Sequence, residues 1–310
     1  MARRSLASGK IPVELLTDLL AELPPAPPEV RLGPAVGEDA CAVEIPGGIL
    51  VAASDPITLT GENIGRWSVV VNANDVAVTG ARPRWFLAVV LVPPQTTESA
   101  VRELFADISR SLLSVGAHLV GGHTEVTPAV TQPVVVGQML GLAEDGAFVA
   151  SHGAVVGDIV LEVGPAPIEG TAVLARDAAD RLKELSPAVI EAARATLDRP
   201  GISVVEPALL AARLGATALH DPTEGGVAGG LHELARASNV GIRVDRGAML
   251  WFEPGLAVCR ALGADPWSTL ASGTLLAVFP AEIALTARAA IAEDGYPAAV
   301  IGIVESGTGV

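Results

Sequence analysis

Acidic side chains follow a glycine or end an apolar run at several places where they could bind a metal ion. Asp39 lies in the turn Gly37-Glu38-Asp39-Ala40, and Asp55 ends an apolar run that reads as a strand. Mg²⁺ in proteins is usually held by one or two carboxylates together with phosphate oxygens. Both aspartates are therefore candidate metal ligands. The alternatives are a solvated turn for the first cluster and an ordinary turn aspartate for Asp55.

A third cluster, Asn72-Ala73-Asn74-Asp75, lies inside the valine-rich segment 68–79. The valines favour a strand, but the spacing of the segment suits a helix equally well. In a helix, Asn72 and Asp75 would share one face. Buried polar side chains need partners, so the cluster is either part of a binding site or a structural hydrogen-bond network.

A fourth cluster joins a short predicted strand to a predicted helix that opens with glycine, in the run His220-Asp221-Pro222-Thr223-Glu224-Gly225-Gly226. Such a helix start presents free N–H groups and a positive dipole end, which suit phosphate. Asp221 and Glu224 would instead need a metal ion. The alternative is that Asp221 or Thr223 only caps the helix.

The run Gly121-Gly122-His123-Thr124-Glu125 also follows a predicted strand. The two glycines allow close approach of a ligand. His123 is a candidate base, with an ordinary core or surface histidine as the alternative. The sequence contains none of the common phosphate-binding, serine-hydrolase or zinc-protease motifs, so a nucleotide site cannot be inferred from them.

The composition narrows the classes of partner. The 310 residues include 20 basic and 35 acidic side chains, which gives a net charge of -15 and argues against nucleic acid. Bound phosphates would need a cation between them and the carboxylates. Cys41 and Cys259 are widely spaced and indicate ordinary thiols in a reducing cytoplasm rather than a disulfide framework or catalytic residues.

Periodicity predicts two comparable halves, 1–150 and 151–310, each mixing helices and strands in an α+β or α/β arrangement. No apolar run is long enough to span a membrane. The basic residues at positions 1–6 are not followed by the apolar segment of a signal peptide. The expectation is therefore a cytoplasmic protein. Predicted helices include 11–23, 98–115, 205–214, 225–238 and 281–293; predicted strands include 85–92, 133–142, 275–279 and 298–304.

In this order the clusters resemble the AIR synthase-like superfamily, and within it most closely the HypE family of hydrogenase maturation factors. The similar stretches are the turn at 37–40, Ser54-Asp55, the run N-D-V-A-V-T-G-A-R-P at 74–83, the G-G-x-T segment at 121–124, and D-P-T-E-G-G-V-A-G-G-L-H-E at 221–233. The last run is the most specific. The resemblance extends over nearly the whole chain.

The resemblance implies a PurM-like N-terminal domain that forms a dimeric β-barrel core with a second subunit, and a PurM-like C-terminal α/β domain. It implies ATP in the cleft and Mg²⁺ held by aspartates, and it implies that segment 68–79 is helical. On this basis the implied metal ligands are Asp39, Asp55, Asp75 and Asp221, with Asp75, Asp221 and His123 as catalytic residues. The implied cofactor-binding residues are Asn72, Asn74, Gly121, Gly122, Thr124, Thr223, Gly225 and Gly226.

Two departures from the HypE pattern affect the predicted reaction. HypE proteins end in a cysteine that receives a carbamoyl group, whereas the sequence ends at Val310 without one, and His123 stands where HypE tends to have aspartate. The resulting expectation is ATP- and Mg²⁺-dependent phosphoryl transfer to, or activation of, a small amide, carboxylate or phosphate acceptor. The alternative is a non-catalytic nucleotide-binding scaffold or a partner of another maturation protein.

Overall fold

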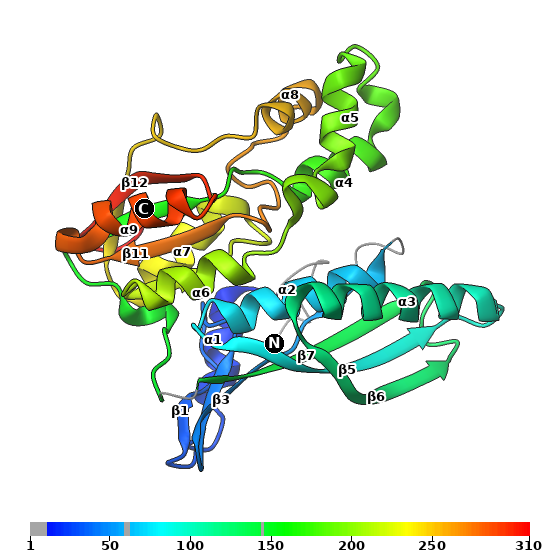
Figure 1. The fold of residues 1–310 in the computed structure, drawn as a ribbon, viewed down its shortest axis with the longest axis horizontal. Helices are drawn as coiled ribbons and strands as arrows, with labels where there is room; N and C mark the ends of the chain where they lie inside the picture. Colours follow the sequence, from blue (N-terminus) through cyan, green and yellow to red (C-terminus); the bar gives the residue numbers. More distant parts are fainter. Residues whose placement is uncertain (1–10, 59–62, 144–145) are drawn as a thin grey trace, which may run out of the picture.

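The computed structural model describes residues 11–58, 63–143 and 146–310, and these form two sheets with helices packed on them (Figure 1). Residues 1–6, the basis for expecting no signal peptide, lie outside the described residues. No helix within the described ranges is long and apolar enough to cross a membrane.

The N-terminal half is built on a seven-stranded sheet in the order β1-β2-β3-β7-β5-β6, with β4 also paired to β7. Only β5 and β6 pair in parallel; the other pairs are antiparallel. The strands are β1 (Val30–Leu32), β2 (Cys41–Ile45), β3 (Gly48–Ala53), β4 (Pro56–Ile57), β5 (Arg82–Val92), β6 (His118–Val126) and β7 (Val134–Ala143). Strands β2 and β3 pair as an antiparallel hairpin, from Cys41 with Ala52 to Ile45 with Gly48.

Helices α2 (Ile64–Ala77) and α3 (Glu98–Val115) cover one face of this sheet (Figure 1). Thirteen of the fourteen residues of α2 are buried. A helix buried on all sides has no polar face, which is why the sequence pattern of 68–79 could not distinguish it from a strand. The helical alternative implied by the family resemblance is confirmed. By contrast, α1 (Val13–Ala21) has no buried residue, although its predicted leucine stripe is present.

The C-terminal half is built on an antiparallel five-stranded sheet in the order β10-β12-β8-β11-β9. The predicted helices and strands of this half are present, while β10 and α8 were not predicted. The strands are β8 (Ile159–Val163), β9 (Ala218–His220), β10 (Gly241–Val244), β11 (Leu275–Phe279) and β12 (Ala298–Glu305); the α-helices are α4 (Glu169–Asp177), α5 (Pro187–Ala195), α6 (Val205–Arg213), α7 (Gly226–Ala237), α8 (Glu253–Leu262) and α9 (Ala281–Glu293). The two-domain α+β class is therefore confirmed, and both the boundary near residue 150 and the dimeric barrel stay predictions.

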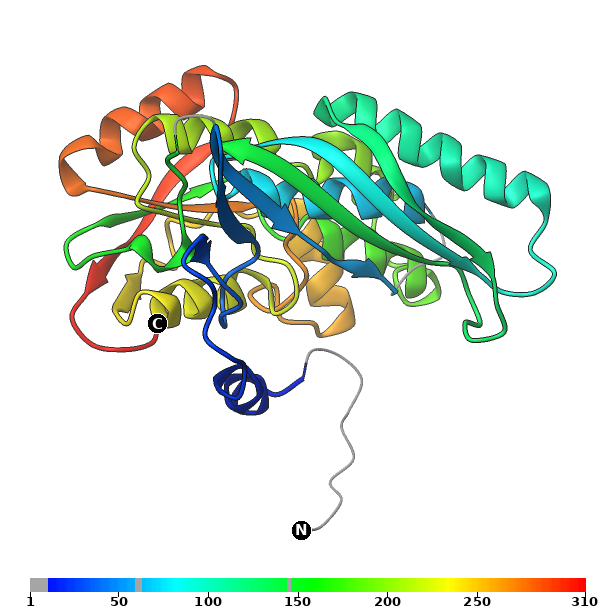
Figure 2. The same cartoon turned by 90° about the horizontal axis from the view of Figure 1, so that it is seen from below.

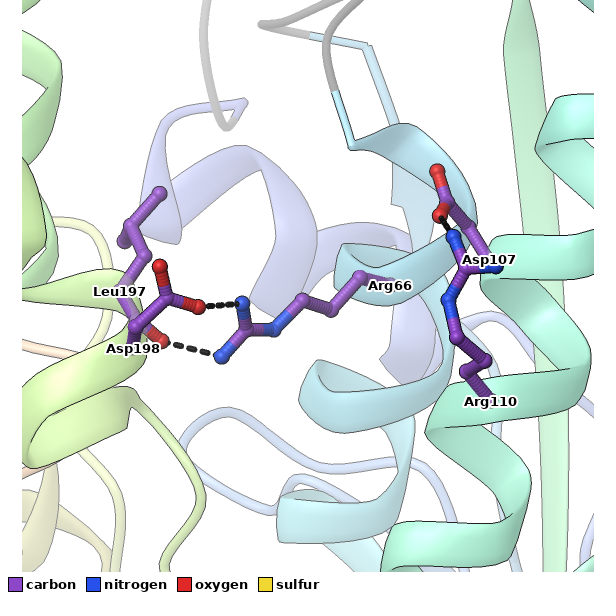
Figure 3. A network of polar contacts seen from close by, with 5 residues as sticks. All are labelled: Arg66, Asp107, Arg110, Leu197 and Asp198. Atoms are coloured by element: carbon purple, nitrogen blue, oxygen red, sulfur yellow. Dashed lines mark hydrogen bonds and ion pairs between the residues drawn. The ribbon is translucent and has the colours of Figure 1, made fainter.

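Helix α2 is also the main contact between the halves. In its third turn, Asn74 donates from Nδ2 to the Ile202 carbonyl at 2.9 Å and accepts at Oδ1 from the Val204 amide at 2.9 Å. In its first turn, Arg66 donates to the Asp198 carboxylate and to the Leu197 carbonyl (Figure 3). The segment from Leu197 to Val204 is thus attached to α2 at two places, one buried and one exposed.

The two attachments should contribute differently to the free energy of unfolding. Asn74→Ala should lower the free energy of unfolding by roughly 2–4 kcal/mol, because it leaves two buried main-chain groups without partners. Arg66→Ala removes an exposed ion pair and should cost about 1 kcal/mol or less. Urea unfolding of both variants measures the difference. Equal losses would mean that the buried amide does not dominate the contact.

Candidate active site

Two buried aspartates, one from each half of the chain, lie close together. Asp75 is on α2 and is 5% exposed; Asp221 directly follows β9 and is 2% exposed. Burial raises the pKa of Asp75 well above its usual range, and the charge of Asp221 raises it further. Burial likewise raises the pKa of Asp221, with a further contribution from Asp39. Two residues that are 146 positions apart in the sequence therefore share one electrostatic environment.

Neither carboxylate oxygen of Asp221 has a hydrogen-bond partner among the described residues, and both are buried. Asp55 acts on both buried aspartates and raises their pKa values. A buried carboxylate without donors is costly because nothing in the protein replaces its lost hydration. A bound cation would supply a partner for the Asp221 oxygens and would reduce the repulsion between the aspartates.

His220 supplies a positive charge next to the aspartates. Its ring lies between two carboxylates, with Nδ1 donating to Asp39 Oδ2 at 2.7 Å and Nε2 donating to Glu233 Oε2 at 2.8 Å. Burial alone would lower the pKa of His220, but Asp39 and Glu233 outweigh it and raise the pKa well above its ordinary value. The imidazolium lowers the pKa of both Asp75 and Asp221 in turn.

Neither His220 nor Glu233 was among the predicted site residues. His220 lies next to Asp221, and Glu233 ends the most specific motif of the sequence, so both were visible as neighbours of the site. Their pairing with Asp39 was not visible, because Asp39 is 181 positions from His220.

The turn at residues 37–40 is fixed against the C-terminal half rather than solvated. Glu38 accepts from the Ser151 amide at 3.1 Å and pairs with His152 Nδ1 at 2.6 Å. Gly37 has a φ of +88°, and a Cβ there would lie 3.2 Å from the Glu233 carbonyl oxygen. The left-handed φ favours glycine in the turn, and the close approach of α7 leaves little room for a Cβ. The result is that Asp39 is held beside His220.

The structure gives Asn72 and Asn74 positioning contacts. Asn72 accepts from the Asp55 amide at 2.8 Å and donates to the carbonyls of Asp55 and Ser68, so it sets the path of the chain at Asp55. Asn74 uses its amide to hold Ile202 and Val204. Both residues lie on α2 near Asp75. Their expected contact with a cofactor stays a prediction, and their observed partners are all main-chain groups.

The turn that carries Asp221 also begins α7, as predicted. Gly225 and Gly226 have φ values of +86° and +64°. A Cβ on Gly226 would lie 2.5 Å from the Trp267 carbonyl oxygen and 2.6 Å from that of Thr269. The Thr223 carbonyl accepts from the Gly226 amide at 3.1 Å and from the Ala271 amide at 3.4 Å. The observed glycine requirement is thus structural, and nucleotide binding by Thr223, Gly225 and Gly226 stays a prediction.

Within one chain, β6 does not reach the aspartates. The Gly137 amide on β7 bonds the Asp55 carbonyl, Gly137 pairs with Ala88 on β5, and Ala88 pairs with Gly122 on β6. Two strands therefore separate Gly122 from Asp55, a distance of roughly 14 Å at the usual strand spacing. His123 is exposed, and its nearest acidic partner is Glu125. The catalytic role of His123 and the cofactor-binding roles of Gly121, Gly122 and Thr124 stay predictions.

The acidic residues fit a cation whose other ligands come from a bound phosphate. Among the residues that the structure places, no three His, Cys, Asp or Glu side chains already form a complete metal-binding group. Mg²⁺ commonly takes only one or two carboxylates and completes its octahedron with phosphate and water oxygens. The donor set here, with both Asp221 oxygens unpartnered, matches that chemistry. All four predicted metal ligands belong to one electrostatic cluster, because the charges of Asp39, Asp55 and Asp221 all raise the pKa of Asp75.

Comparison with known proteins identifies the family. The family described as AIR synthase related protein, C-terminal domain, matches residues 155–310, and its N-terminal counterpart matches residues 37–143. The chain belongs to the AIR synthase related family. The matched ranges of this family contain all four aspartates of the cluster.

Relatives and solved structures point to the HypE branch of the AIR synthase related family. The chain is 30% identical to the carbamoyl dehydratase HypE of Bradyrhizobium diazoefficiens, over 83% of this chain and 74% of that protein. A structure of the hydrogenase maturation protein HypE in complex with ATP superposes with a TM-score of 0.71 at 25% identity, covering 88% of this chain and 82% of that one. The fold also matches a HypE-HypF complex, with a TM-score of 0.75 at 22% identity and coverage of 94% and 93%.

The electrostatic strain of the cluster gives a stability prediction. Asp75→Asn and Asp221→Asn should each raise the melting temperature of the metal-free protein by about 2–4 °C, the shift that roughly 1 kcal/mol produces in domains of this size. The raised pKa values also mean that the native protein retains these protons to higher pH than the unfolded chain. Unfolding free energy should therefore fall as pH rises through the raised pKa values, and less steeply in either variant.

The control is Asp180→Asn, an exposed aspartate that pairs with Lys183. Scanning calorimetry across pH measures the shifts. Destabilisation by both site variants, with no change in the control, would show that the two ionised carboxylates contribute net stability instead of strain.

Proposed function

We propose that this member of the AIR synthase related family is an ATP-dependent enzyme that transfers a phosphoryl group from Mg²⁺–ATP to a small amide, carboxylate or phosphate acceptor. The observation that carries the proposal is the pair Asp75 and Asp221, buried together from two halves of the chain with both Asp221 oxygens unpartnered. A buried carboxylate without donors, with further carboxylates around it, is suited to a phosphate-bound divalent cation.

The identity of the nucleotide is supported by the ATP-bound HypE structure and by a cavity next to the cluster. The cavity has a volume of about 560 Å³ and lies between α1 and the sheet. Its apolar lining includes Leu16, Leu20 and Leu140, while Asp39 and Ser54 lie at its polar side. We place the nucleoside in this cavity, with the phosphates directed toward the aspartates.

Each residue of the cluster then has a distinct task. Asp75 and Asp221, with Asp39 and Asp55, would hold the Mg²⁺ ions, and the metal would neutralise charge on the transferring phosphoryl group. His220 holds Asp39 in place through a charged hydrogen bond. Asn72 fixes the chain at Asp55. Since ATP is a substrate of the cell interior, the proposal also implies a cytoplasmic protein.

A second candidate function is a non-catalytic nucleotide-binding scaffold that acts with another maturation protein. The similarity to a structure in which HypE is bound to HypF is the observation in its favour. Both functions require nucleotide binding, but only the first produces ADP. A steady-state assay of ADP formation separates them.

We further propose that the protein is a homodimer through its N-terminal sheet. Helices α2 and α3 cover one face of the sheet, and Figure 2 shows the strands of the sheet lying in front of α2 on the other side. Strand β6 is exposed along its whole length, including Leu119, Val120 and Val126, and α1 exposes Leu15 and Leu19. Exposed apolar edges of this kind favour a partner sheet.

The nucleotide proposal predicts that ATP binds only with a divalent cation. The net charge of -15 and the excess of carboxylates at the site should repel the bare triphosphate. A fluorescent ATP analogue should therefore bind in Mg²⁺ or Mn²⁺ and lose at least tenfold in affinity in EDTA. Equal affinity in both buffers would contradict a bridging metal.

One chain has a mass of 31.4 kDa. The dimer proposal predicts that light scattering at micromolar concentration gives twice this mass. Val120→Lys on exposed β6 should shift the protein toward monomer, because a buried lysine in the interface would lose its hydration. Leu285→Lys, an exposed change on α9, is the matched control. A monomeric native protein at this concentration would exclude the proposed dimer.

A further inference from the structure

A buried glutamate lies in the middle of the C-terminal sheet. Glu162 is on β8, opposite Leu276 of β11 and Ala299 of β12, and the residue is 0% exposed. Side chains two apart on a strand share one face of the sheet, so Val160 lies on the same face as Glu162. Val160 and Leu276 belong to one apolar cluster with Leu231 of α7. The carboxyl group therefore lies in the apolar layer between the sheet and α7.

The Glu162 carboxyl group binds one main-chain amide and leaves one oxygen without a partner. Its Oε2 accepts from the Leu250 amide at 2.7 Å. Its Oε1 is buried and has no hydrogen-bond partner among the described residues. An ionised carboxylate there would exchange its hydration for a single N–H donor, which disfavours the charged form. The geometry therefore favours the neutral acid, with its proton on Oε1.

Charged groups on the surrounding elements do not compensate a Glu162 carboxylate. By strand pairing, His220 lies on β9 beyond Leu276, two strands from Glu162 and roughly 10 Å away at the usual spacing. Both ring nitrogens of His220 bond other carboxylates. The remaining charged groups of β10, β12, α7, segment 245–252 and the loop before β11 are half-buried or exposed: Arg243, Glu305, His232, Glu233, Arg236, Asp245, Arg246 and Asp265. Burial raises the pKa of Glu162 to about 8, and the bond from Leu250 offsets only part of this effect.

Leu250 belongs to segment 245–252, which joins β10 to α8. Besides the bond to Glu162, two main-chain bonds attach the segment to the residues that follow β8. The Ala166 amide donates to the Leu250 carbonyl at 2.9 Å, and the Phe252 amide donates to the Ala166 carbonyl at 2.7 Å. Glu162 is thus the only side chain among the described residues that bonds the Leu250 amide.

Segment 245–252 also packs on the loop that supports the start of α7. Trp251 meets Trp267 of this loop edge to face, with ring centroids 5.0 Å apart and planes at 81°. The Trp267 carbonyl accepts from the Ala228 amide in the first turn of α7 at 2.9 Å. The bond from Glu162 therefore anchors a segment whose tryptophan contacts the support of α7.

We propose that Glu162 is a pH-dependent anchor: its neutral form holds segment 245–252 on the C-terminal sheet, and loss of its proton releases the segment. An ionised carboxylate recovers its hydration only if water reaches it. Leu250 and Trp251 are half-buried, whereas Leu276 on the neighbouring strand is buried, so movement of the segment gives water the more direct access. This device does not depend on the proposed nucleotide reaction.

The direction of the pH effect follows from the two protonation states. In the anchored state Glu162 keeps its proton up to about pH 8, whereas a hydrated glutamate has a pKa near its ordinary value of 4.5. The contribution of Glu162 to the anchored state is therefore complete below the ordinary pKa. It falls as pH rises toward 8 and is lost above that pH.

The test is amide hydrogen exchange of the native protein by mass spectrometry, from about pH 6 to about pH 9.5, corrected for the intrinsic exchange rate. Glu162→Gln keeps an acceptor for the Leu250 amide but cannot ionise, and Glu162→Leu removes the acceptor. The control is Glu282→Gln, an exposed change in the first turn of α9. The buried strand β11 reports global unfolding in the same samples.

In the wild-type protein, the protection of segment 245–252 should fall by up to about tenfold per pH unit and level off above pH 8, since release takes up one deprotonation. Glu162→Gln should keep nearly constant protection, Glu162→Leu should be weakly protected at every pH, and Glu282→Gln should equal wild type. Strand β11 should exchange more slowly than the segment throughout, because the release is local.

Equal pH dependence in the wild-type protein and Glu162→Gln would overturn the proposal. Exchange of β11 together with the segment would also overturn it, because global unfolding would then explain both. If Glu162→Gln does not fold, the wild-type protein still decides: protection of the segment that does not change below pH 8 excludes the anchor.

Discussion

The burial of Asp75 against Asp221 is the constraint on which the arrangement of this protein depends. Each carboxylate would be stable alone at a surface, where water solvates its charge. Both are buried and have raised pKa values: the charge of Asp221 adds to the effect of burial at Asp75, and the charge of Asp39 adds to it at Asp221. Neither Asp221 oxygen accepts a hydrogen bond from another described residue. The fold must therefore supply enough favourable contact elsewhere to hold two repelling groups in place. Repulsion between buried carboxylates is expected to leave the site strained when no ligand is bound.

Helix α2 supplies much of that contact. It is buried on nearly every side, and it holds the Asp55 chain through Asn72 and the C-terminal segment through Asn74. The same helix presents Asp75 between these two contacts. On the opposite side, Glu38 and Asp39 of one turn bind His152 and His220 of the other half. The aspartates are thus fixed by a set of hydrogen bonds that cross from one sheet to the other, not by any local motif.

The cluster also separates two different environments. On the N-terminal side lies a largely apolar cavity under α1, of a size and polarity that suit a nucleoside. On the C-terminal side, Glu169 and Ser272 form a polar position next to the Asp221 turn. The aspartates themselves carry the negative charge of the site, and a bound cation is the simplest way to balance it.

Sequence alone determined much of this protein. The periodic apolar stripe of α3 and the apolar runs of the central strands predicted regular elements, and the motifs around Asp75 and Asp221 indicated the family before the geometry was known. Those signals are local: a turn glycine, a carboxylate at the end of a strand, a helix with one polar face. Where a helix has no polar face, as in α2, the pattern could not separate helix from strand.

Only the tertiary structure decided which partners these residues have. His220 reaches Asp39 across 181 positions, and Ser272 reaches Glu169 across 103, and no spacing rule links such pairs. The sequence left open whether Asn72 and Asn74 belong to a binding site or to a structural hydrogen-bond network, and the fold shows both amides bonded to main-chain groups. The charge state of a carboxylate, and hence its chemistry, depends on burial and on neighbours brought in by packing. That is why the sequence could name the aspartates, while the fold was needed to show which of them are strained and what lies beside them.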